Sequence, residues 1–201
     1  MMVEKKTHSR VLPKVLVIGV VAVIIGMFMA FLSSGLTGKS DVTGRSGEQL
    51  EGRMAPDFAA LSIDDTIMSL SEYRGSPVIL NFWASWCPPC REETPILQRV
   101  WDENQDQGII VLGVNVQDSE EDYLEYLEEF EVTFSNVYDE GGRITVDYGV
   151  TGLPVTFFID RRGEIVGRWV GAISFDSLST WTESLLTGVL PVRGNGNNLE
   201  K

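Results

Sequence analysis

The sequence predicts an α/β fold in which helices flank a central mixed β-sheet, with one transmembrane helix at the N-terminus. Three observations lead to this prediction. Eighteen consecutive residues near the start carry no charge. Later in the chain, short continuous apolar runs alternate with segments in which apolar residues recur at helical spacing, as in an α/β domain. Near the C-terminal end, two strand-like runs are separated by a short polar turn, which indicates an antiparallel pair within the sheet.

The N-terminal 32 residues have the pattern of a membrane anchor. Residues 1–14 hold four Lys or Arg against one Glu, a basic flank of the kind that stays in the cytoplasm. Residues 15–32 would rise about 27 Å as a helix, close to the hydrocarbon thickness of a bilayer. The alternative is a cleaved signal peptide, whose apolar region is usually only about 7–15 residues long. We therefore expect a retained signal anchor in the cell membrane, with a single pass and the remaining chain extracytoplasmic.

Three segments follow this anchor. Residues 33–53 include eleven Gly, Ser or Thr among twenty-one and are predicted to form a flexible linker. Residues 54–187 have the length of one domain. Residues 188–201 contain the stretch RGNGNN and are expected to be a disordered tail.

Charge is divided unevenly along the chain. The net charge of −13 combines +4 in residues 1–40 with −17 in residues 41–201. A domain this acidic has no basic surplus to neutralise phosphates, so nucleic acid is excluded as a partner. Two cysteines and one histidine exclude a disulfide scaffold and argue against a zinc site built from one chain, so no metal is expected.

Strand and helix signals follow in a regular order within the predicted domain. Ser119 and Asp122 have the spacing of a capping box at the start of a helix, and the turn 160–163 joins two strands as a hairpin. The predicted strands are 58–61 and 66–70, which form a short hairpin, and 77–83, 109–116, 155–159 and 164–170. The predicted helical segments are the single turn 71–75 and the helices 91–105, 119–131 and 175–186.

The chemistry of the domain is carried by Trp86-Cys87-Pro88-Pro89-Cys90, which follows a predicted strand and opens a helix. Thiols three residues apart can come within bonding distance over one helical turn. Cys87 would stand at the helix N-terminus, where unpaired N–H groups and the macrodipole stabilise a thiolate, the attacking species in disulfide exchange. Cys90 would then resolve the mixed disulfide.

Three other interpretations of the two cysteines are weaker. A structural disulfide that closes so small a loop removes little entropy from the unfolded chain. A zinc half-site needs further ligands, and the only histidine, His8, lies on the other side of the predicted membrane helix. Inert thiols are not expected at a helix N-terminus. A redox-active pair is therefore the favoured hypothesis.

The segment NFWASWCPPCREETP resembles the active site of the thioredoxin superfamily. It looks most like that of membrane-anchored thiol–disulfide oxidoreductases of the TlpA, ResA and CcmG type. The resemblance covers about residues 54–186 and includes the opening MAPDF (shared with peroxiredoxins), Pro95 in the active-site helix, the loop GLPVT, and an extra segment at about 117–150. It implies a thioredoxin-like fold and a cis peptide bond before Pro154.

The resemblance also identifies two positions that bear on proton transfer. Asn81 replaces the buried aspartate that manages the proton of the second cysteine in cytosolic thioredoxins. Glu93, one helical turn after Cys90, falls where ResA-like members place an active-site glutamate, so we expect its carboxylate beside the dithiol. The hypothesis is that burial raises the pKa of Glu93 and lets it shuttle a proton. The alternative is that Glu93 only favours the positive helix N-terminus, as Glu92 does.

Two surfaces are predicted around the motif. An apolar docking surface for substrate is expected near Cys87, because the cis bond that the resemblance implies would leave the backbone of Leu153 free to pair with an extended peptide by strand addition. Its predicted members are Trp83, Trp86, Pro88, Leu153 and Pro154. The alternative is that Pro154 only marks the start of a strand. The predicted helix at 120–131 holds seven acids in twelve residues and is interpreted as a solvated face, with docking of basic partners as the alternative.

The predicted protein is a thiol–disulfide oxidoreductase that reduces disulfides in cysteine-containing extracytoplasmic partners. The resemblance alone suggests apocytochrome c, in cytochrome c maturation, as the substrate. Nothing in the chain indicates an NADPH or flavin site, so no cofactor is expected and a membrane dithiol reductant would act upstream. The alternatives are a disulfide-forming oxidase of the same fold, a thiol peroxidase, and a copper chaperone, which normally needs a histidine that the domain lacks.

The two prolines between the cysteines predict the direction of the exchange. Neither proline has an N–H to donate to the sulfur of Cys87, so the thiolate is less stabilised than in a strongly oxidising site. We expect a reducing potential for the cysteine pair, measured by equilibration with glutathione buffers. A potential near that of the strong periplasmic oxidants would contradict this prediction.

Overall fold

The computed structural model describes residues 50–62, 64 and 66–191, and six residues of the N-terminal part: Gly19, Val21, Val23, Ile24, Ile25 and Met27. The chain divides into two units, residues 1–44 and 45–201. In the first unit, the six described residues are helical. The rest of the predicted membrane segment 15–32, the basic end 1–14, residues 33–49 of the predicted linker and the tail from residue 192 lie outside the described residues. Among the residues that are described, no helix has the length and apolar character needed to cross a bilayer.

The second unit is built on a mixed sheet of seven strands in the order β2-β1-β5-β4-β3-β6-β7. β3, β4 and β5 are parallel, whereas β1, β2, β6 and β7 pair antiparallel with their neighbours. The strands are β1 (Ala59–Ser62), β2 (Ile67–Ser69), β3 (Val78–Trp83), β4 (Ile110–Val116), β5 (Ser135–Asp139), β6 (Val155–Ile159) and β7 (Ile165–Val170). The predicted mixed sheet is confirmed, and both predicted hairpins are present as β1–β2 and β6–β7.

In the described part of this unit, four α-helices and three short 3-10 helices accompany the sheet. They are α2 (Pro88–Asn104), α3 (Glu120–Glu129), α4 (Arg143–Asp147), α5 (Phe175–Thr187), η2 (Leu70–Tyr73), η3 (Gln105–Gln107) and η4 (Glu140–Gly142). α3 begins as predicted, because the hydroxyl of Ser119 accepts the backbone N–H of Asp122. α5 ends at Gly188, whose φ of 77° is the left-handed conformation that glycine adopts at a helix C-terminus.

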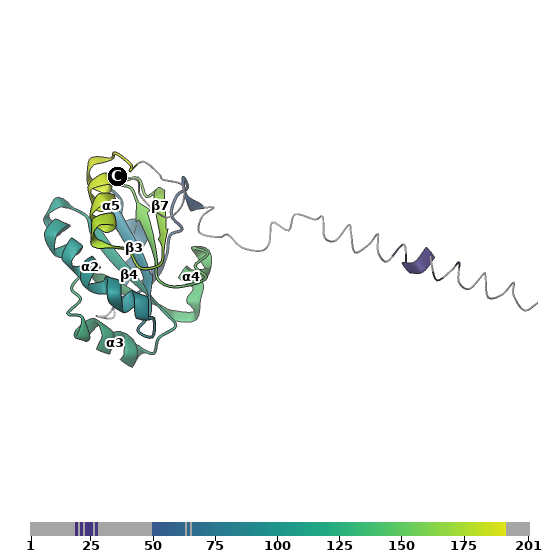
Figure 1. Cartoon of the computed structure of the whole chain (residues 1–201). Coiled ribbons are helices and arrows are strands. Elements are labelled where there is room, and N and C mark those ends of the chain that lie inside the picture. Colours follow the sequence, from purple (N-terminus) through teal and green to yellow (C-terminus); the bar gives the residue numbers. More distant parts are fainter. Residues whose placement is uncertain are drawn as a thin grey trace, which may run out of the picture. The chain divides into compact units, whose positions relative to one another are not determined.

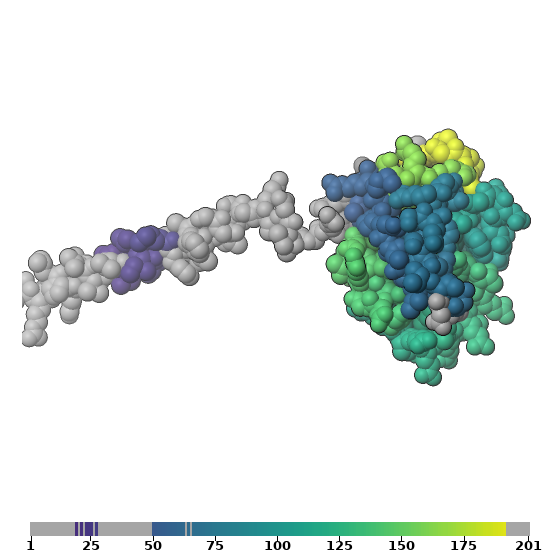
Figure 2. All heavy atoms as spheres, turned by 180° about the vertical axis from the view of Figure 1, so that it is seen from behind, coloured from purple at the N-terminus to yellow at the C-terminus, as the bar shows by residue number. Residues whose placement is uncertain are grey.

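Alternate residues of the buried strands face two different helix layers. Ile79 on β3 packs with Leu97 of α2 and Trp181 of α5, which form the layer on one face. Figure 1 shows α2 and α5 on the same side of the sheet. The next residue, Leu80, packs on the opposite face with Ile144 of α4. Figure 2 shows that face from behind, with the blue first part of the domain beside the green region of α4.

The structure contains two elements that the sequence pattern does not predict, β5 and α4. β5 reads SNVYD, in which polar residues interrupt the apolar ones, yet Asn136 and Asp139 are buried. Each has its own partners: Asn136 accepts the indole N–H of Trp83 (2.9 Å), and Asp139 accepts the backbone N–H of Ile144 (2.9 Å) at the start of α4. Because these polar side chains are satisfied, a polar-looking segment forms an interior strand.

The packed region begins four residues before the predicted boundary at Met54. Leu50 is buried in the core. The backbone of Gly52 donates to the carbonyl of Ile165, and the backbone of Ile165 donates to the carbonyl of Arg53, each at 2.8 Å. Residues 50–53 therefore belong to the domain, because they extend its hydrogen bonding beyond β7.

Gly113 on β4 makes room for the bond between Trp83 and Asn136. The three residues lie on neighbouring strands, and a Cβ at position 113 would overlap Oδ1 of Asn136 and lie 2.8 Å from Nε1 of Trp83. We expect Gly113→Ala to lower the free energy of unfolding by about 3 kcal/mol, through overpacking and loss of this bond. Denaturant unfolding would measure the change. The control is Gly152→Ala, at an exposed position with open space, where we expect a change within about 0.5 kcal/mol; equal changes in the two variants would contradict the prediction.

Candidate functional site

A disulfide joins Cys87 and Cys90 at the N-terminus of α2. The S–S distance is 2.08 Å, and Cys87 is the N-cap of the helix. Pro88 and Pro89 occupy the first two helical positions, so the first N–H that can reach the sulfur of Cys87 belongs to Cys90, and it does so at 3.3 Å. Cys87 is 4% exposed and Cys90 is fully buried. The sulfur that stands at the helix end is therefore the one through which a partner can reach the pair.

The turn between β3 and α2 brings the pair to the end of the sheet. β3 ends at Trp83, and the N–H of Cys87 donates to the carbonyl of Ala84 at 3.2 Å. Within that turn, the N–H and the hydroxyl of Ser85 both donate to the carboxylate of Asp118. The sequence pattern alone does not point to Ser85 or Asp118 as site residues. The signal in the sequence is that Asp118 is a polar residue just after the buried strand β4. The parallel neighbour of β4 is β3, which leads into the cysteine motif.

Glu93 is buried in the core, with 1% of its surface exposed. One carboxylate oxygen accepts the side-chain amide of Asn81 (2.7 Å), and the other accepts the backbone N–H of Ile173 (3.0 Å). The amide of Asn81 also donates to the hydroxyl of Thr156 on β6 (3.0 Å). Among the described residues Glu93 makes no hydrogen bond to either sulfur. Its place one turn after Cys90 therefore directs it into the core between β3 and β6, not toward solvent at the helix end.

The surroundings of Glu93 act on its proton in opposite directions. Burial raises the pKa of Glu93 to about 7, whereas the hydrogen bonds from Asn81 and from the backbone of Ile173 favour the carboxylate and lower it. Desolvation is the larger effect. A buried carboxyl group with a pKa near neutrality can both accept and release a proton under physiological conditions.

An aromatic cluster packs behind the disulfide. Trp83 stacks on Tyr126 of α3 with 4.2 Å between ring centroids, and both pack in one group with Cys87 and Cys90. The hydroxyl of Tyr126 is 2.6 Å from that of Thr94 on α2. The prediction that Trp83 lines a docking surface is wrong: the residue is 3% exposed, because α3 covers its ring and Asn136 binds its indole N–H.

The other predicted docking residues differ in exposure. Trp86 is 58% exposed and Pro88 is exposed, whereas Leu153 is half-buried against the group that contains both cysteines. Pro154 is buried and therefore does not line the accessible surface as predicted. It follows a cis peptide bond, as the resemblance implies, and directly precedes β6. Within the described part of the chain, neither backbone polar group of Leu153 is hydrogen-bonded. Trp86, Pro88 and Leu153 thus remain accessible beside the disulfide.

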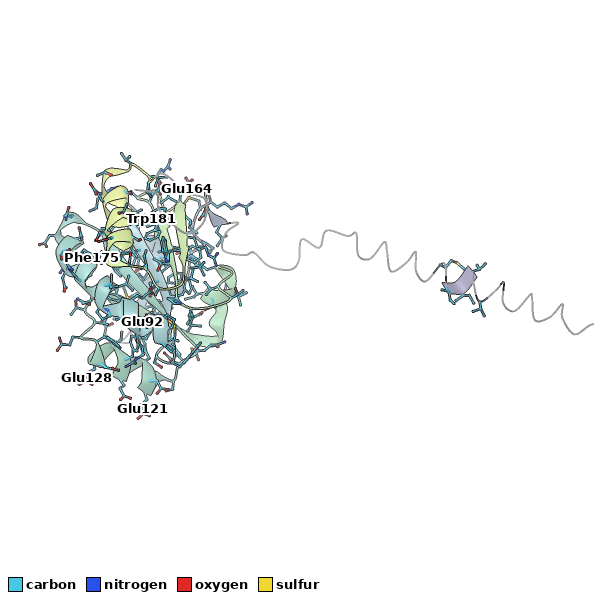
Figure 3. All side chains as sticks on the ribbon, in the orientation of Figure 1. Glu92, Glu121, Glu128, Glu164, Phe175 and Trp181 are labelled. Carbon is cyan, nitrogen blue, oxygen red and sulfur yellow. A yellow bond between two sulfur atoms is a disulfide. The ribbon has the colours of Figure 1, made fainter. Side chains whose placement is uncertain are left out.

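The seven acids at 120–131 are exposed, as expected of a solvated face. Figure 3 shows Glu121 and Glu128 pointing away from the domain. Glu129 forms an ion pair with Arg91, the residue after Cys90, and the guanidinium of Arg91 lies over the ring of Phe130. Arg91 therefore joins the end of the acidic helix to the start of α2.

Two further features lie outside this site. A cavity of about 580 Å³ lies where β1 and β2 meet the region of α4, and none of its lining residues belongs to the cysteine motif or to the hydrogen bonds of Glu93. Among the described residues, no group of three or more His, Cys, Asp or Glu side chains could hold a metal ion.

Comparison with known proteins identifies relatives that have thiol–disulfide activity. Residues 52–168 match the AhpC/TSA family. The chain is 34% identical over 134 residues to the thiol-disulfide oxidoreductase ResA of Geobacillus thermodenitrificans, an alignment that covers 67% of this chain and 77% of that one.

Solved structures agree with this relationship. A thiol:disulfide interchange protein of the thioredoxin family from Chlorobium tepidum is 28% identical with a TM-score of 0.60, covering 66% of this chain and 95% of that one. A secreted Mycobacterium tuberculosis disulfide oxidoreductase, homologous to DsbE of Escherichia coli, is 25% identical with a TM-score of 0.60, covering 64% and 96%. The central mixed sheet and its helices therefore form a thioredoxin-like fold.

The raised pKa of Glu93 predicts a pH-dependent stability. Between pH 4.5 and about 7 the unfolded carboxyl group is ionised while the buried one keeps its proton. The folded state thus binds more protons than the unfolded state, and the free energy of unfolding falls by about 3 kcal/mol as the pH rises through this range. In Glu93→Gln this contribution is absent, so denaturant unfolding at pH 4.5 and 7 should show a smaller loss. Glu92→Gln, at an exposed position on the same helix, is the control; an unchanged loss in Glu93→Gln would contradict the prediction.

Proposed function

The chain belongs to the AhpC/TSA family, as a thioredoxin-like thiol–disulfide oxidoreductase of the ResA type, and we propose that it reduces disulfides in partner proteins through Cys87 and Cys90. The observation that carries the proposal is the placement of this pair, with the sulfur of Cys87 at the N-terminus of α2 and that of Cys90 fully buried behind it. Such an arrangement favours one attacking thiolate and one resolving thiol.

The exchange proceeds in two balanced steps from the reduced protein. The thiolate of Cys87 attacks one sulfur of the partner's disulfide, and the partner's other sulfur leaves as a thiolate. The thiolate of Cys90 then attacks the sulfur of Cys87 in the mixed disulfide and releases the partner's second thiolate. Two electrons pass to the partner, which takes up two protons, and Cys87–Cys90 becomes a disulfide.

Glu93 manages a proton in the second step, because Cys90 must lose its proton before it can attack. A carboxyl group with a pKa of about 7, one helical turn beyond Cys90, has the proton affinity for this role. Since Glu93 makes no hydrogen bond to the sulfur of Cys90 among the described residues, the transfer would pass through an intervening water or thiol movement. The bonds to Asn81 and Ile173 hold the carboxyl group in place for it.

Partner proteins dock beside Cys87 in an extended conformation. The backbone of Leu153 offers an N–H and a carbonyl for pairing with such a segment, which reads the partner's backbone with little demand on its sequence. The exposed side chains of Trp86 and Pro88 supply apolar contact area next to the reacting sulfur. Pro154, buried behind Leu153, supports this loop.

The proposed setting is the outer side of the cell membrane. Residues 15–32 would anchor the chain, residues 1–14 would stay in the cytoplasm, and cysteine-containing extracytoplasmic proteins such as apocytochrome c would be the substrates. The secreted disulfide oxidoreductase among the structural relatives supports such a location. Electrons would come from a dithiol reductant in the membrane.

A trapping experiment tests the proposed function and identifies the partner. In Cys90→Ala the second step cannot occur, so Cys87 should hold the partner as a mixed disulfide that reducing agent releases. Mass spectrometry of the adducts from cells would name the partner. The matched control is Cys87→Ala, in which we expect at least about tenfold less adduct because the remaining Cys90 is fully buried. Equal adduct levels in the two variants would contradict the proposal. So would a Cys90→Ala protein that forms no mixed disulfide through Cys87.

A further inference from the structure

The turn that leads into the cysteine pair is held by a residue from a distant part of the chain. Ser85 lies inside this turn, between Ala84 and Cys87. Its backbone N–H donates to one carboxylate oxygen of Asp118 and its hydroxyl donates to the other, each at 2.8 Å. The direction of a backbone N–H two residues before Cys87 is therefore set by a side chain that follows β4.

Asp118 is itself held from several sides. Its residue surface is 7% exposed, and the amide of Asn115 donates to the same oxygen that accepts the N–H of Ser85. The hydroxyl of Tyr138 on β5 donates to the backbone carbonyl of Asp118 at 2.6 Å. The side-chain carboxylate of Asp118 thus accepts hydrogen bonds on both of its oxygens, from the N–H and the hydroxyl of Ser85 and from the amide of Asn115. The position therefore requires a side chain with two acceptor oxygens.

The backbone before Asp118 has an unusual conformation. Gln117 has a φ of 56°, in the left-handed region that few residues other than glycine adopt. At this residue the chain leaves β4, and the next side chain reaches Ser85. Such backbone strain persists where surrounding contacts over-determine it, and it concentrates at functional sites. Next to Gln117, the contact of this kind is the pair of hydrogen bonds between Asp118 and Ser85, in the turn before Cys87.

We propose that Asp118 is a positioning residue for thiol–disulfide exchange, which acts through Ser85 to set the turn that presents Trp86 and Cys87. Asp118 also connects this turn to β5, because the hydroxyl of Tyr138 donates to the backbone carbonyl of Asp118. A displaced turn would change how the sulfur of Cys87 meets the N–H of Cys90, its donor at the helix end. For its effect on exchange the proposal rests on the proposed function, whereas its effect on the reactivity of Cys87 can be measured without any partner.

The experiment compares Asp118→Asn, Asp118→Ala, Ser85→Ala and Ser85→Thr in the reduced full-length protein. The pH profile of iodoacetamide alkylation at Cys87, resolved by mass spectrometry, reports its thiolate. We expect both Asp118 variants to shift the midpoint by at least about half a pH unit. We also expect them to lower kcat/KM for reduction of glutathione disulfide about tenfold, the effect of one lost hydrogen bond to a charged group. Ser85→Ala should shift both in the same direction by less, and Ser85→Thr should restore the wild-type values.

Two comparisons make the test specific. Asp122→Asn removes an exposed acid four residues further on and should leave the profile unchanged. In the double variant Asp118→Ala/Ser85→Ala, the effect should not exceed that of Asp118→Ala alone, because both changes break one contact. If Asp118→Ala does not fold, Ser85→Ala and Ser85→Thr decide the question.

The outcomes separate this proposal from the proposed function. Folded Asp118→Asn and Ser85→Ala proteins with the alkylation profile of Asp122→Asn would overturn it. Fully additive effects of the two alanine substitutions would overturn the route through Ser85. A wild-type protein that fails to reduce glutathione disulfide would count against the proposed function, while the alkylation profiles would still decide the role of Asp118.

Discussion

The hydrogen bond between the amide of Asn81 and the carboxyl group of Glu93 is the interaction on which the arrangement of the site depends. It joins β3 to α2 at 2.7 Å, and the same amide reaches Thr156 on the neighbouring strand β6. The second oxygen of Glu93 accepts the N–H of Ile173, just before α5. One buried carboxyl group thus connects α2 to the strands β3 and β6 and to the backbone just before α5. To remove it would leave buried donors without an acceptor, which costs more than the bond itself contributes.

The choice of an amide at position 81 has an electrostatic consequence. An aspartate there would place a second carboxyl group beside Glu93, and two neighbouring acids raise each other's pKa. With Asn81 as a neutral donor, Glu93 is the single acid in this hydrogen-bonded group, and burial raises its pKa to about 7 although the hydrogen bonds from Asn81 and Ile173 act to lower it. The pKa of Glu93 therefore depends on how completely the core shields this one side chain from solvent.

The segment between β4 and β6 acts on the site from behind. Its strand β5 supplies Asn136, which binds the indole of Trp83 across Gly113, and its helix α3 supplies Tyr126, which stacks on the same indole. Trp83 is thereby fixed on both sides and forms the packed floor beneath the disulfide. The loop at the start of this segment also holds the turn before Cys87, through Asp118. What looks in the sequence like an extra segment is thus part of the support of the active-site end of α2.

Much of the fold followed from local patterns, because buried strands and amphipathic helices are recorded in the spacing of apolar residues. The continuous apolar runs predicted β3, β4 and β6 within a residue or two, and the hairpin turn predicted β7. β5 was not predicted, since Asn136 and Asp139 give it a polar pattern and become acceptable inside the sheet only through partners on β3 and α4. The burial of Trp83 is likewise not predictable from its strand. Alternation along a strand tells which residues share a face, but it does not tell that α3 covers the face on which Trp83 lies.

The chemistry at the helix end follows from the local sequence. Two thiols three residues apart, with two prolines between them, fix the pairing, the N-terminal position of Cys87 and the absence of N–H donors before Cys90, because these properties depend only on covalent structure and helix geometry. The environment of Glu93 and the contact of Asp118 with Ser85 depend on the tertiary structure. Helical spacing places Glu93 one turn from Cys90, but its burial and its pKa come from β3, β6 and Ile173, far apart in the chain. Desolvation and hydrogen bonding between distant residues are set when the elements pack together, and no local pattern records them.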